Sequence, residues 1–400
     1  MKAAPGTSGP RLAVAQIVDT LDTGGAEHLA INFANQLAER GHRSHIYVIG
    51  HTGPLAAAIS GNVGVDVLEF RRNSIENPLK FSASISDGFR RLRFLIKRDG
   101  IELVQTHLPS PNFWGLALSL GRACVCIATI HNNKEFSYGS NNSLKEGLRH
   151  AAYRTIVRHC AASVAVSDMV RTSFLGEIGL REDQAARLLS IPNGVEIPEW
   201  APPMEKLAAK KRLGFDTGPL LGIAVGRVCE QKNFQDLIPV MSELKGMNVP
   251  IQFVIAGDGP EMPDLLKRRA EAGLEREIKT LGNVTNIPEY LKAADFFLMP
   301  SLWEGLPLAL LEAMAAGLPV VGYAIDGLTD VIEEGQTGYL VPFGDRTAMA
   351  QRILGLAQDP DLRLSLGSKG RDVAKERFNL QRVVDDIERL YFSVLARQQG

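Results

Sequence analysis

Residues 220–260, LLGIAVGRVCEQKNFQDLIPVMSELKGMNVPIQFVIAGDGP, contain the pattern that decides the fold. Two short apolar runs, Leu220–Val225 and Ile251–Ala256, show no polar alternation, which is typical of strands buried on both faces of a parallel sheet. Between them, residues 234–243 carry apolar side chains at helical spacing. A strand, a helix and a second strand in this order predict a parallel β–α–β unit.

The same alternation continues along most of the chain. Further strands are predicted at residues 12–18, 45–49, 103–106, 125–130, 164–167, 278–281, 296–299 and 319–323. Further helices are predicted at residues 26–40, 82–98, 111–120, 143–159, 168–178, 262–272, 287–293, 306–316, 360–376 and 380–397.

A proline-rich connector at residues 191–203 interrupts this alternation and predicts a domain boundary near residue 198. We therefore expect an α/β protein with two Rossmann-like, doubly wound parallel-sheet lobes, residues 1–198 and 199–400. Ligand is expected in the cleft between the C-terminal ends of their strands. The last helix is a candidate to pack back on the first lobe.

The composition excludes several classes of protein. With 45% hydrophobic and 22% charged residues, the chain can bury full-sized cores, so disordered and fibrous classes are excluded. The net charge of −1 argues against a protein that coats nucleic acid. Residues 1–200 carry a charge of +3 and the remainder −4, so the first half is the one expected to meet an anionic surface.

No targeting segment is expected. Residues 1–10 contain one lysine and no apolar core, unlike a secretory signal. The longest uncharged run, residues 103–121, is broken by polar residues and prolines, so it is not a transmembrane helix. The four cysteines are too few and too scattered for a disulfide scaffold and predict buried free thiols. Together these features predict a cytoplasmic protein.

The densest chemical signal surrounds the expected start of the helix at residues 306–316. Glu304 and Glu312 flank this start, and the backbone amides of Gly305 and Leu306 are expected to form an anion site at the helix N-terminus, with Pro307 in its first turn. In a continuous helix, two residues eight positions apart are separated by about 12 Å along the axis, the scale of a nucleotide sugar. A partly exposed glutamate on an ordinary helix is the alternative for Glu312.

Two cations follow the strand Leu220–Val225. Gly226 allows a ligand to approach the backbone, Arg227 can grip a diphosphate with two hydrogen bonds, and Lys232 adds a point charge. Two solvated basic side chains in a loop are the alternative. Their place in the same lobe as Glu304 favours a phosphate site.

The first lobe offers glycines and histidines at strand ends. Gly24 and Gly25 open its first helix and permit close approach of a phosphate or a sugar, although a plain strand-to-helix turn explains them equally well. His107 and His131 end two predicted strands, where doubly wound folds place working residues. A hydrogen-bonded structural histidine is the alternative, favoured for His107. The G-x-G-x-x-G fingerprint is absent here, which disfavours a nicotinamide or flavin enzyme.

In order along the chain, these motifs resemble the retaining GT-B glycosyltransferases of family 4. The resemblance rests on Gly24-Gly25-Ala26-Glu27, Thr129-x-His131, Pro192-Asn193-Gly194-Val195, Gly226-Arg227-x4-Lys232, Ala256-Gly257-Asp258-Gly259-Pro260 and Glu304-x7-Glu312. Each motif alone is common, but the ordered set spans nearly the whole chain and is specific.

For the second lobe, the resemblance implies a donor site. Arg227 and Lys232 would bind the donor diphosphate, helped by the amides of Gly305 and Leu306, and Glu312 would hold the ribose hydroxyls. In the same lobe, Glu304 would contact the transferred hexose and Val284 would run beside the nucleobase. In the first lobe, His131 would lie near the 6-hydroxyl of the hexose and the reacting centre. Gly25, with Gly24, would line the phosphate and acceptor side, and Asn193-Gly194-Val195 would close the lobe.

Two departures from the family pattern concern sugar and acceptor preference. Asn132 stands where many relatives have Asp, and Asp330 stands where Glu is usual. The D-x-D sequence Asp359-Pro360-Asp361 lies between two helices, where Asp serves as an N-cap. No protein-held metal and no other cofactor is therefore expected.

The resemblance implies a retaining, metal-independent hexosyltransferase of polysaccharide or glycoconjugate biosynthesis. It would move a sugar from a nucleotide-sugar donor, with UDP preferred over GDP, to a hydroxyl of a glycan or polyprenyl-linked saccharide. A sugar-nucleotide 2-epimerase and a non-catalytic sugar-nucleotide-binding assembly subunit remain alternatives.

Two basic amphipathic stretches, residues 89–98 and 144–158, could rest on an anionic membrane surface and make the enzyme a peripheral protein of the inner face of the cytoplasmic membrane. A solvated charged face on a core helix is the alternative for each.

Overall fold

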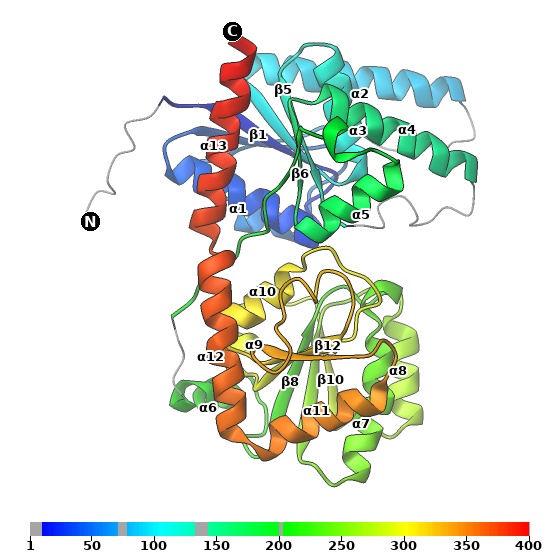
Figure 1. Cartoon of the computed structure of the whole chain (residues 1–400), viewed down its shortest axis with the longest axis vertical. Helices are drawn as coiled ribbons and strands as arrows, with labels where there is room; N and C mark the ends of the chain where they lie inside the picture. The colour runs from blue at the N-terminus through cyan, green and yellow to red at the C-terminus, as the bar shows by residue number, and fades with distance from the viewer. Residues whose placement is uncertain (1–9, 71–77, 133–142, 200–202, 400) are drawn as a thin grey trace. The chain divides into compact units, whose positions relative to one another are not determined.

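In the computed structural model, residues 10–70, 78–132, 143–199 and 203–399 are described. They form two α/β units, the first made of Met1–Pro192 with Gln381–Gly400 and the second of Asn193–Leu380. Figure 1 shows the strands of each unit side by side with helices packed around them. Both units have the parallel-sheet, Rossmann-like architecture predicted from the sequence, whereas the cleft expected between the lobes stays a prediction.

The first unit is built on a seven-stranded parallel sheet in the order β3-β2-β1-β4-β5-β6-β7. Its strands are β1 (Ala13–Val18), β2 (Arg43–Val48), β3 (Gly64–Val67), β4 (Leu103–His107), β5 (Val125–Ile130), β6 (Ala162–Ala165) and β7 (Leu188–Ser190). Its helices are α1 (Gly25–Glu39), α2 (Pro78–Arg98), α3 (Pro109–Leu120), α4 (Ser143–His159), α5 (Asp168–Ile178) and α13 (Leu380–Gln399).

The second unit contains a six-stranded parallel sheet in the order β10-β9-β8-β11-β12-β13. Its strands are β8 (Leu220–Val225), β9 (Ile251–Ala256), β10 (Ile278–Gly282), β11 (Phe296–Met299), β12 (Val320–Tyr323) and β13 (Gly338–Val341). Its helices are α6 (Pro203–Arg212), α7 (Leu237–Gly246), α8 (Met262–Glu271), α9 (Ile287–Ala293), α10 (Leu308–Ala315), α11 (Arg346–Gln358) and α12 (Pro360–Arg377).

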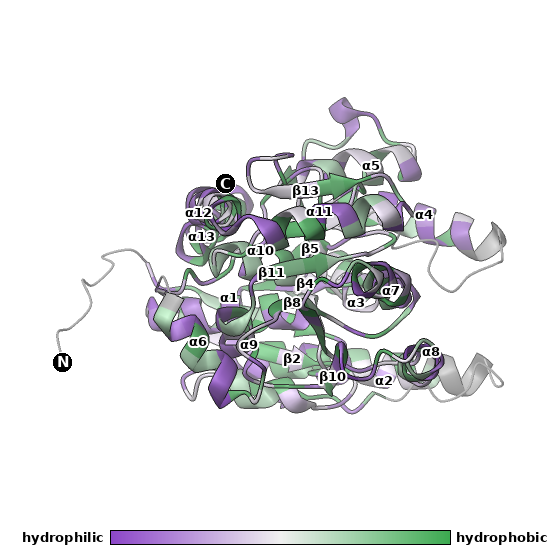
Figure 2. Ribbon diagram, turned by 90° about the horizontal axis from the view of Figure 1, so that it is seen from below, coloured by the Kyte–Doolittle hydropathy of each residue, from purple (hydrophilic) through white to green (hydrophobic). Residues whose placement is uncertain are grey.

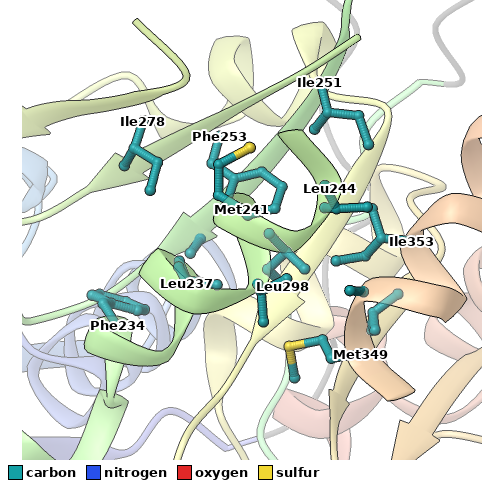
Figure 3. Packing of buried hydrophobic residues seen from close by; sticks show 14 of the residues in the cluster. Phe234, Leu237, Met241, Leu244, Ile251, Phe253, Ile278, Leu298, Met349 and Ile353 are labelled. Atoms are coloured by element: carbon teal, nitrogen blue, oxygen red, sulfur yellow. The ribbon is translucent and has the colours of Figure 1, made fainter. Parts of the chain in front are cut away.

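The core of the second unit shows why residues 220–260 decide the fold. Leu237, Met241 and Leu244 recur at helical spacing, so they line one face of α7 and pack against the sheet residue Phe253 and the α11 residue Ile353 (Figure 3). Colouring by hydropathy shows apolar strands and helices with one apolar and one polar side (Figure 2). Burial of both sheet faces follows from this pattern.

The division between the units falls after Pro192, rather than after residue 198. Val195 explains the difference, since its N–H donates to Phe378 O (2.8 Å) and its carbonyl accepts from Leu380 N (2.9 Å). Asn193-Gly194-Val195 therefore belongs to the second unit, contrary to its expected place in the first lobe. Residues 200–202 of the proline-rich connector and residues 1–9 of the amino-terminal segment lie outside the described residues.

The last helix packs on the first unit. Arg40 Nη1 at the end of α1 donates to Glu388 Oε2 of α13 (2.8 Å), and His42 Nε2 lies 2.9 Å from Glu388 Oε1. A row of α13 residues is buried, namely Val383, Val384, Ile387, Leu390, Tyr391 and Val394.

All the predicted strands are present within a few residues, but β3, β7 and β13 were missed. Each of these three is an edge strand of its sheet. Edge strands are short and partly exposed, so they lack the continuous apolar run that identifies a central strand. Among helices, α6 and α11 were missed.

Candidate active site

Glu304 and Lys232, predicted independently from two loops, lie in contact. Glu304 follows β11 and is only 5% exposed, and its Oε1 accepts a hydrogen bond from Lys232 Nζ at 2.6 Å. Its Oε2 accepts a weaker bond from Gln231 Nε2 at 3.3 Å. A buried carboxylate without a partner would be costly, and the Lys232 ammonium group supplies that partner.

The loops after β8 and β11 are joined by further hydrogen bonds. Leu302 N donates to Gln231 O (2.8 Å), Gln231 Nε2 to Trp303 O (3.0 Å) and Asn233 Nδ2 to Pro300 O (3.1 Å). The two strands are neighbours in the sheet, so both loops leave its carboxyl edge together. The two loops therefore form one hydrogen-bonded unit.

Asp236, at the start of α7, is a buried hub beneath these loops. Its Oδ2 accepts from Asn233 Nδ2 (2.8 Å) and from the hydroxyl of Tyr323 on β12 (2.7 Å), and its Oδ1 accepts from Arg346 Nε (2.7 Å). Asn233 has φ +48° and ψ +41°, a left-handed conformation that asparagine tolerates. Asp236 holds Asn233 in this turn, directly after Lys232.

Glycines bring the strand-end loops into close contact. A Cβ on Gly257, whose φ is +145°, would lie 1.9 Å from Gly226 O, so the loops after β9 and β8 touch through their backbones. A Cβ on Gly327 would lie 2.1 Å from Gly305 O, so the loop after β12 packs on the segment that precedes α10. No residue with a side chain fits at either position without movement of the backbone.

The helix predicted from residue 306 begins at Leu308, and Pro307 is its N-cap rather than part of its first turn. Pro307 disfavours the helical conformation for Leu306, whose carbonyl also accepts from Asn193 Nδ2 at 2.6 Å. The amides of Gly305 and Leu306 thus precede the helix, and the continuous-helix separation of Glu304 and Glu312 does not apply. The first-turn amides without intrahelical acceptors are those of Leu308 and Ala309.

Arg227 and Glu312 remain available to a ligand. Arg227 is exposed, and its guanidinium has no hydrogen-bond or ion-pair partner among the residues the structure describes. Glu312 is partly exposed on α10, and its carboxylate likewise has no partner within the described ranges. Desolvation by burial raises the pKa of Glu312 to about 7. Val284 lies half-buried in the loop after β10, at the same edge of the sheet.

In the first unit, the predicted residues gather at the carboxyl ends of β1, β4 and β5, which are neighbours in the sheet. Gly25 is the first residue of α1 and Gly24 is its N-cap, in an extended conformation. The carboxylate of Glu27 folds back over Gly24, where a Cβ would lie 2.1 Å from its Oε2. Desolvation, together with Asp19 and Asp22, raises the pKa of Glu27 to about 7.

His131 follows β5 and contacts His107 at the end of β4. His107 Nδ1 and His131 Nε2 are 3.1 Å apart, and His107 Nε2 lies 2.8 Å from Gln16 Oε1. Burial lowers the pKa of His131 to about 4 and that of His107 well below its usual value, so both rings are neutral near pH 7.

Two protein-family models match the chain. The model described as Glycosyltransferase Family 4 matches residues 23–198, and the model described as Glycosyl transferases group 1 matches residues 205–373. The two models divide most of the chain between them in the same order as the two units. The chain belongs to glycosyltransferase family 4.

Relatives of this family 4 glycosyltransferase align with most of its length. It is 24% identical to N-acetyl-alpha-D-glucosaminyl L-malate synthase of Bacillus anthracis over 93% of this chain and 94% of the relative. It is 27% identical to an Escherichia coli UDP-Gal:alpha-D-GlcNAc-diphosphoundecaprenol alpha-1,3-galactosyltransferase, over 76% of this chain and 78% of that protein. Neither the epimerase nor the non-catalytic subunit finds support among these relatives.

Solved structures share the GT-B fold of this glycosyltransferase. Anabaena Alr3699/HepE, crystallised with UDP and glucose, superposes with a TM-score of 0.81 at 19% identity, covering 96% of this chain and all of that one. The sucrose-phosphate synthase of Thermosynechococcus elongatus superposes with a TM-score of 0.80 at 21% identity, covering 97% of this chain and all of that one.

Several polar residues of the candidate site were not predicted from the sequence. Gln231 and Asn233 lie in the loop of the predicted cations, and Asp236 lies at the start of α7. Their signal was a cluster of polar side chains beside an apolar helix. Gln16 is a buried polar residue inside the otherwise apolar strand β1. A polar residue in a buried strand is expensive unless it is hydrogen-bonded, which is the signal that could have found it.

Other features of the glycosyltransferase lie away from the candidate site. His45, Asp66 and Asp99 are grouped like metal ligands, but Arg98 donates hydrogen bonds to both carboxylates. Asp359 caps α12 as predicted, accepting from Leu362 N at 2.9 Å. The four cysteines are free thiols, three of them buried. No helix in the described part of the chain is both long and apolar enough to span a bilayer.

Proposed function

We propose that this enzyme transfers a hexose from a UDP-sugar to a hydroxyl of a glycan or polyprenyl-linked saccharide, with retention at the anomeric carbon and without a protein-held metal. Relatives support the substrate classes: the Escherichia coli enzyme uses UDP-Gal and a diphosphoundecaprenol acceptor, and the Anabaena structures hold UDP with glucose or UDP-glucose. The phosphatidyl-myo-inositol mannosyltransferase of Mycobacterium leprae is 28% identical over 79% of both chains.

The Lys232–Glu304 contact carries the proposal. The ammonium group has three N–H donors, of which one is directed to Glu304, so two remain for diphosphate oxygens. Glu304, fixed by Lys232 and Gln231, presents a carboxylate edge that can accept hydrogen bonds from sugar hydroxyls. One ion pair thus positions a phosphate ligand and a sugar ligand side by side.

The surrounding residues complete a donor site in this proposal. Arg227, exposed and free of protein partners in the described residues, binds the diphosphate and stabilises the departing UDP. The backbone at Gly305 and Leu306 leads into the positive end of α10, which adds to this stabilisation. Glu312 accepts hydrogen bonds from the ribose hydroxyls, and Val284 lies beside the nucleobase.

In the first unit, His131 contacts the transferred sugar near its 6-hydroxyl. Gly24 and Gly25 permit close approach on the phosphate and acceptor side. A neutral imidazole can accept or donate a hydrogen bond without adding a charge. No enzymic nucleophile is assigned to the face opposite the leaving group, so the acceptor attacks on the face that UDP leaves. The cations Arg227 and Lys232 take the part that a divalent metal plays in other enzymes.

A panel of nucleotide sugars tests the proposal. Purified protein should release UDP from one UDP-sugar, in the presence of EDTA, only when membrane extract or a glycan acceptor is present. Proton NMR of the first-formed glycoside should show the anomeric configuration of the donor. An inverted anomer contradicts retention, acceptor-independent conversion of the donor supports an epimerase, and loss of turnover with EDTA contradicts metal independence.

We further propose that α2 rests on an anionic membrane surface on the cytoplasmic side. Phe94 is 66% exposed, and Arg90, Arg93 and Lys97 lie exposed around it on the same helix. A large exposed apolar side chain among cations suits the boundary of an anionic bilayer. The second basic stretch offers Leu148 on α4, which is also exposed.

Liposome flotation tests this surface. The wild type should float with vesicles containing anionic lipid and not with neutral vesicles, and Phe94→Asp should abolish flotation. Phe343→Asp, which replaces a similarly exposed phenylalanine of the second unit, is the matched control and should float like the wild type. Equal flotation of both variants contradicts the proposed role of α2.

A further inference from the structure

We propose that Tyr391 of α13 is a positioning residue that holds the His131 ring in one tautomer through a buried chain of hydrogen bonds. The relevance of this tautomer to sugar transfer rests on the proposed function of His131. Tyr391 lies far from His131 in sequence, and no motif of the sequence pointed to it. Its hydroxyl is fully buried and makes two hydrogen bonds with the sheet.

The chain of hydrogen bonds follows one face of the central strands. Gln16 of β1 is the register partner of Gln105 of β4, and His107 of β4 is the partner of Thr129 of β5. Gln105 and His107, two positions apart, share a face, as do Thr129 and His131. These neighbouring strands therefore carry a polar stripe, and Tyr391 caps it from the helix packed above.

The stripe contrasts with its surroundings. The remaining β1 residues and the buried α13 residues near Tyr391, including Ile387 and Val394, are apolar. Gln16, Gln105 and His107 are each fully buried. A sheet–helix interface needs no such groups for stability, because apolar packing stabilises it without the desolvation cost of buried polar atoms. A fully satisfied polar network instead specifies a unique geometry.

The orientation of each group sets the direction of donation. His107 Nε2 faces the carbonyl oxygen of Gln16 at 2.8 Å, so this nitrogen carries the proton and Nδ1 has the lone pair. His131 Nε2, 3.1 Å from that lone pair, must therefore be the donor. The neutral His131 ring is thus held as the Nε2–H tautomer.

The orientation of Gln16 is in turn fixed by Tyr391. Gln16 Nε2 donates to the Tyr391 hydroxyl (3.1 Å), the hydroxyl donates to Gln105 Oε1, and Gln105 Nε2 donates to Thr129 Oγ1 (2.9 Å). Without the hydroxyl, the Gln16 amide is free to turn and to present N–H to His107 Nε2. His107 would then carry its proton on Nδ1, and His131 would have to accept at Nε2 and adopt the Nδ1–H tautomer.

The tautomer is measured directly in the substrate-free protein. Full-length protein labelled with ¹⁵N-histidine gives long-range ¹H–¹⁵N correlations that distinguish the two tautomers, and the spectrum of His131→Gln assigns the His131 signals. We expect the Nε2–H pattern in the wild type and a mixture of both tautomers in Tyr391→Phe. The matched control is Tyr47→Phe, which removes the buried hydroxyl that donates to Asp99 (2.7 Å) outside the stripe and should leave the pattern unchanged.

Kinetics provide the second readout. Tyr391→Phe should lower kcat about tenfold with little change in the donor KM. A misdirected His131 ring raises the free energy of the transition state more than it weakens donor binding. Gln16→Leu should have the same effect, and the double variant should be no worse than either single one, since both remove the same chain of bonds. Tyr47→Phe should retain the wild-type kcat.

The outcomes separate this proposal from the proposed function. A His131 pattern in Tyr391→Phe identical to that of the wild type overturns the positioning role, whatever the rate. A wild-type pattern of Nδ1–H also overturns it. A changed tautomer with unchanged kcat supports the positioning of the ring by Tyr391 and contradicts the role of His131 in sugar transfer.

Discussion

Lys232 and Glu304 depend on one another for their burial. Two ions removed from water gain little net stability from their contact, but removal of one partner leaves the other charge uncompensated. The contact of 2.6 Å at a nearly buried carboxylate is therefore a constraint on geometry more than a source of stability. The contribution of the pair to folding is therefore distinct from its contribution to catalysis.

Lys232→Met should lower the free energy of unfolding by about 3 kcal/mol, because Glu304 is left buried and unpaired. It should also lower kcat by about 100-fold or more through the loss of a cation at the diphosphate. Lys232→Met with Glu304→Leu should regain most of the stability and none of the activity. Urea unfolding and initial rates measure the two effects, and full activity in either variant contradicts the assigned role.

The raised pKa of Glu312 predicts that the stability of the substrate-free enzyme depends on pH. Because its pKa is raised from 4.5 to about 7, the folded state binds more protons than the unfolded state between these values, so stability falls as the pH rises through this window. Glu312→Gln removes this loss and should stabilise the protein by about 2–3 kcal/mol at pH 8. The gain should shrink toward pH 5. Thermal unfolding at both pH values measures the difference, and an equal gain at both contradicts the cause.

At the scale of elements, the donor site depends on backbone contact between loops that leave neighbouring strands. Gly257 and Gly226 touch where the loops after β9 and β8 meet, and Gly327 touches Gly305. Such contacts hold the loops closer together than side chains would allow. The position of Glu304 therefore depends on glycines, which have no functional side chain. The motif Ala256-Gly257-Asp258-Gly259-Pro260 has this structural purpose.

Gly257→Ala should lower the free energy of unfolding by about 3 kcal/mol or more. The new methyl group would collide with Gly226 O, and the backbone would be strained as well. Gly273→Ala is the matched control: Gly273 also has a positive φ, +62°, but a Cβ there meets nothing within 4 Å. The control should lower the free energy of unfolding by about 1 kcal/mol. Chemical denaturation compares the two, and equal losses would show that the contact with Gly226 is unimportant.

At the scale of the whole molecule, the first unit is completed by the end of the chain. Helix α13 follows all of the second unit in sequence but packs on α1 and on the face of the first sheet, through Glu388 and Tyr391. The first unit therefore cannot reach its final structure before the second has been synthesised. Its stability depends on a helix that the order of motifs alone could not assign.

Ile387→Asp should destabilise the first unit by about 4 kcal/mol, because it buries an uncompensated charge beneath α13. Differential scanning calorimetry should show the transition of the first unit shifted to lower temperature and that of the second retained. Arg389→Ala, at an exposed position of the same helix, should leave both unchanged. A downward shift confined to the second unit contradicts the packing of α13.

Much of the candidate site could be predicted from the sequence. Lys232, Glu304 and His131 follow strands whose apolar runs are unambiguous, and parallel strands deliver their carboxyl ends to one edge. The start of α10 was wrong by two residues, because Leu306 is held by Asn193, distant in sequence. Gln16, Asp236 and Tyr391 were missed because their significance lies in partners brought together only by folding.

The sequence by itself determined the two α/β units, their central strands and the family, because these follow from local periodicity and from residue types at fixed spacings. Only the tertiary structure decided the contact of Lys232 with Glu304, the place of Asn193 in the second unit and the chain of hydrogen bonds from Tyr391 to His131. Hydrogen bonds and ion pairs act over about 3 Å between groups whose separation in sequence is arbitrary. Their partners are therefore set by the packing of elements rather than by any local pattern.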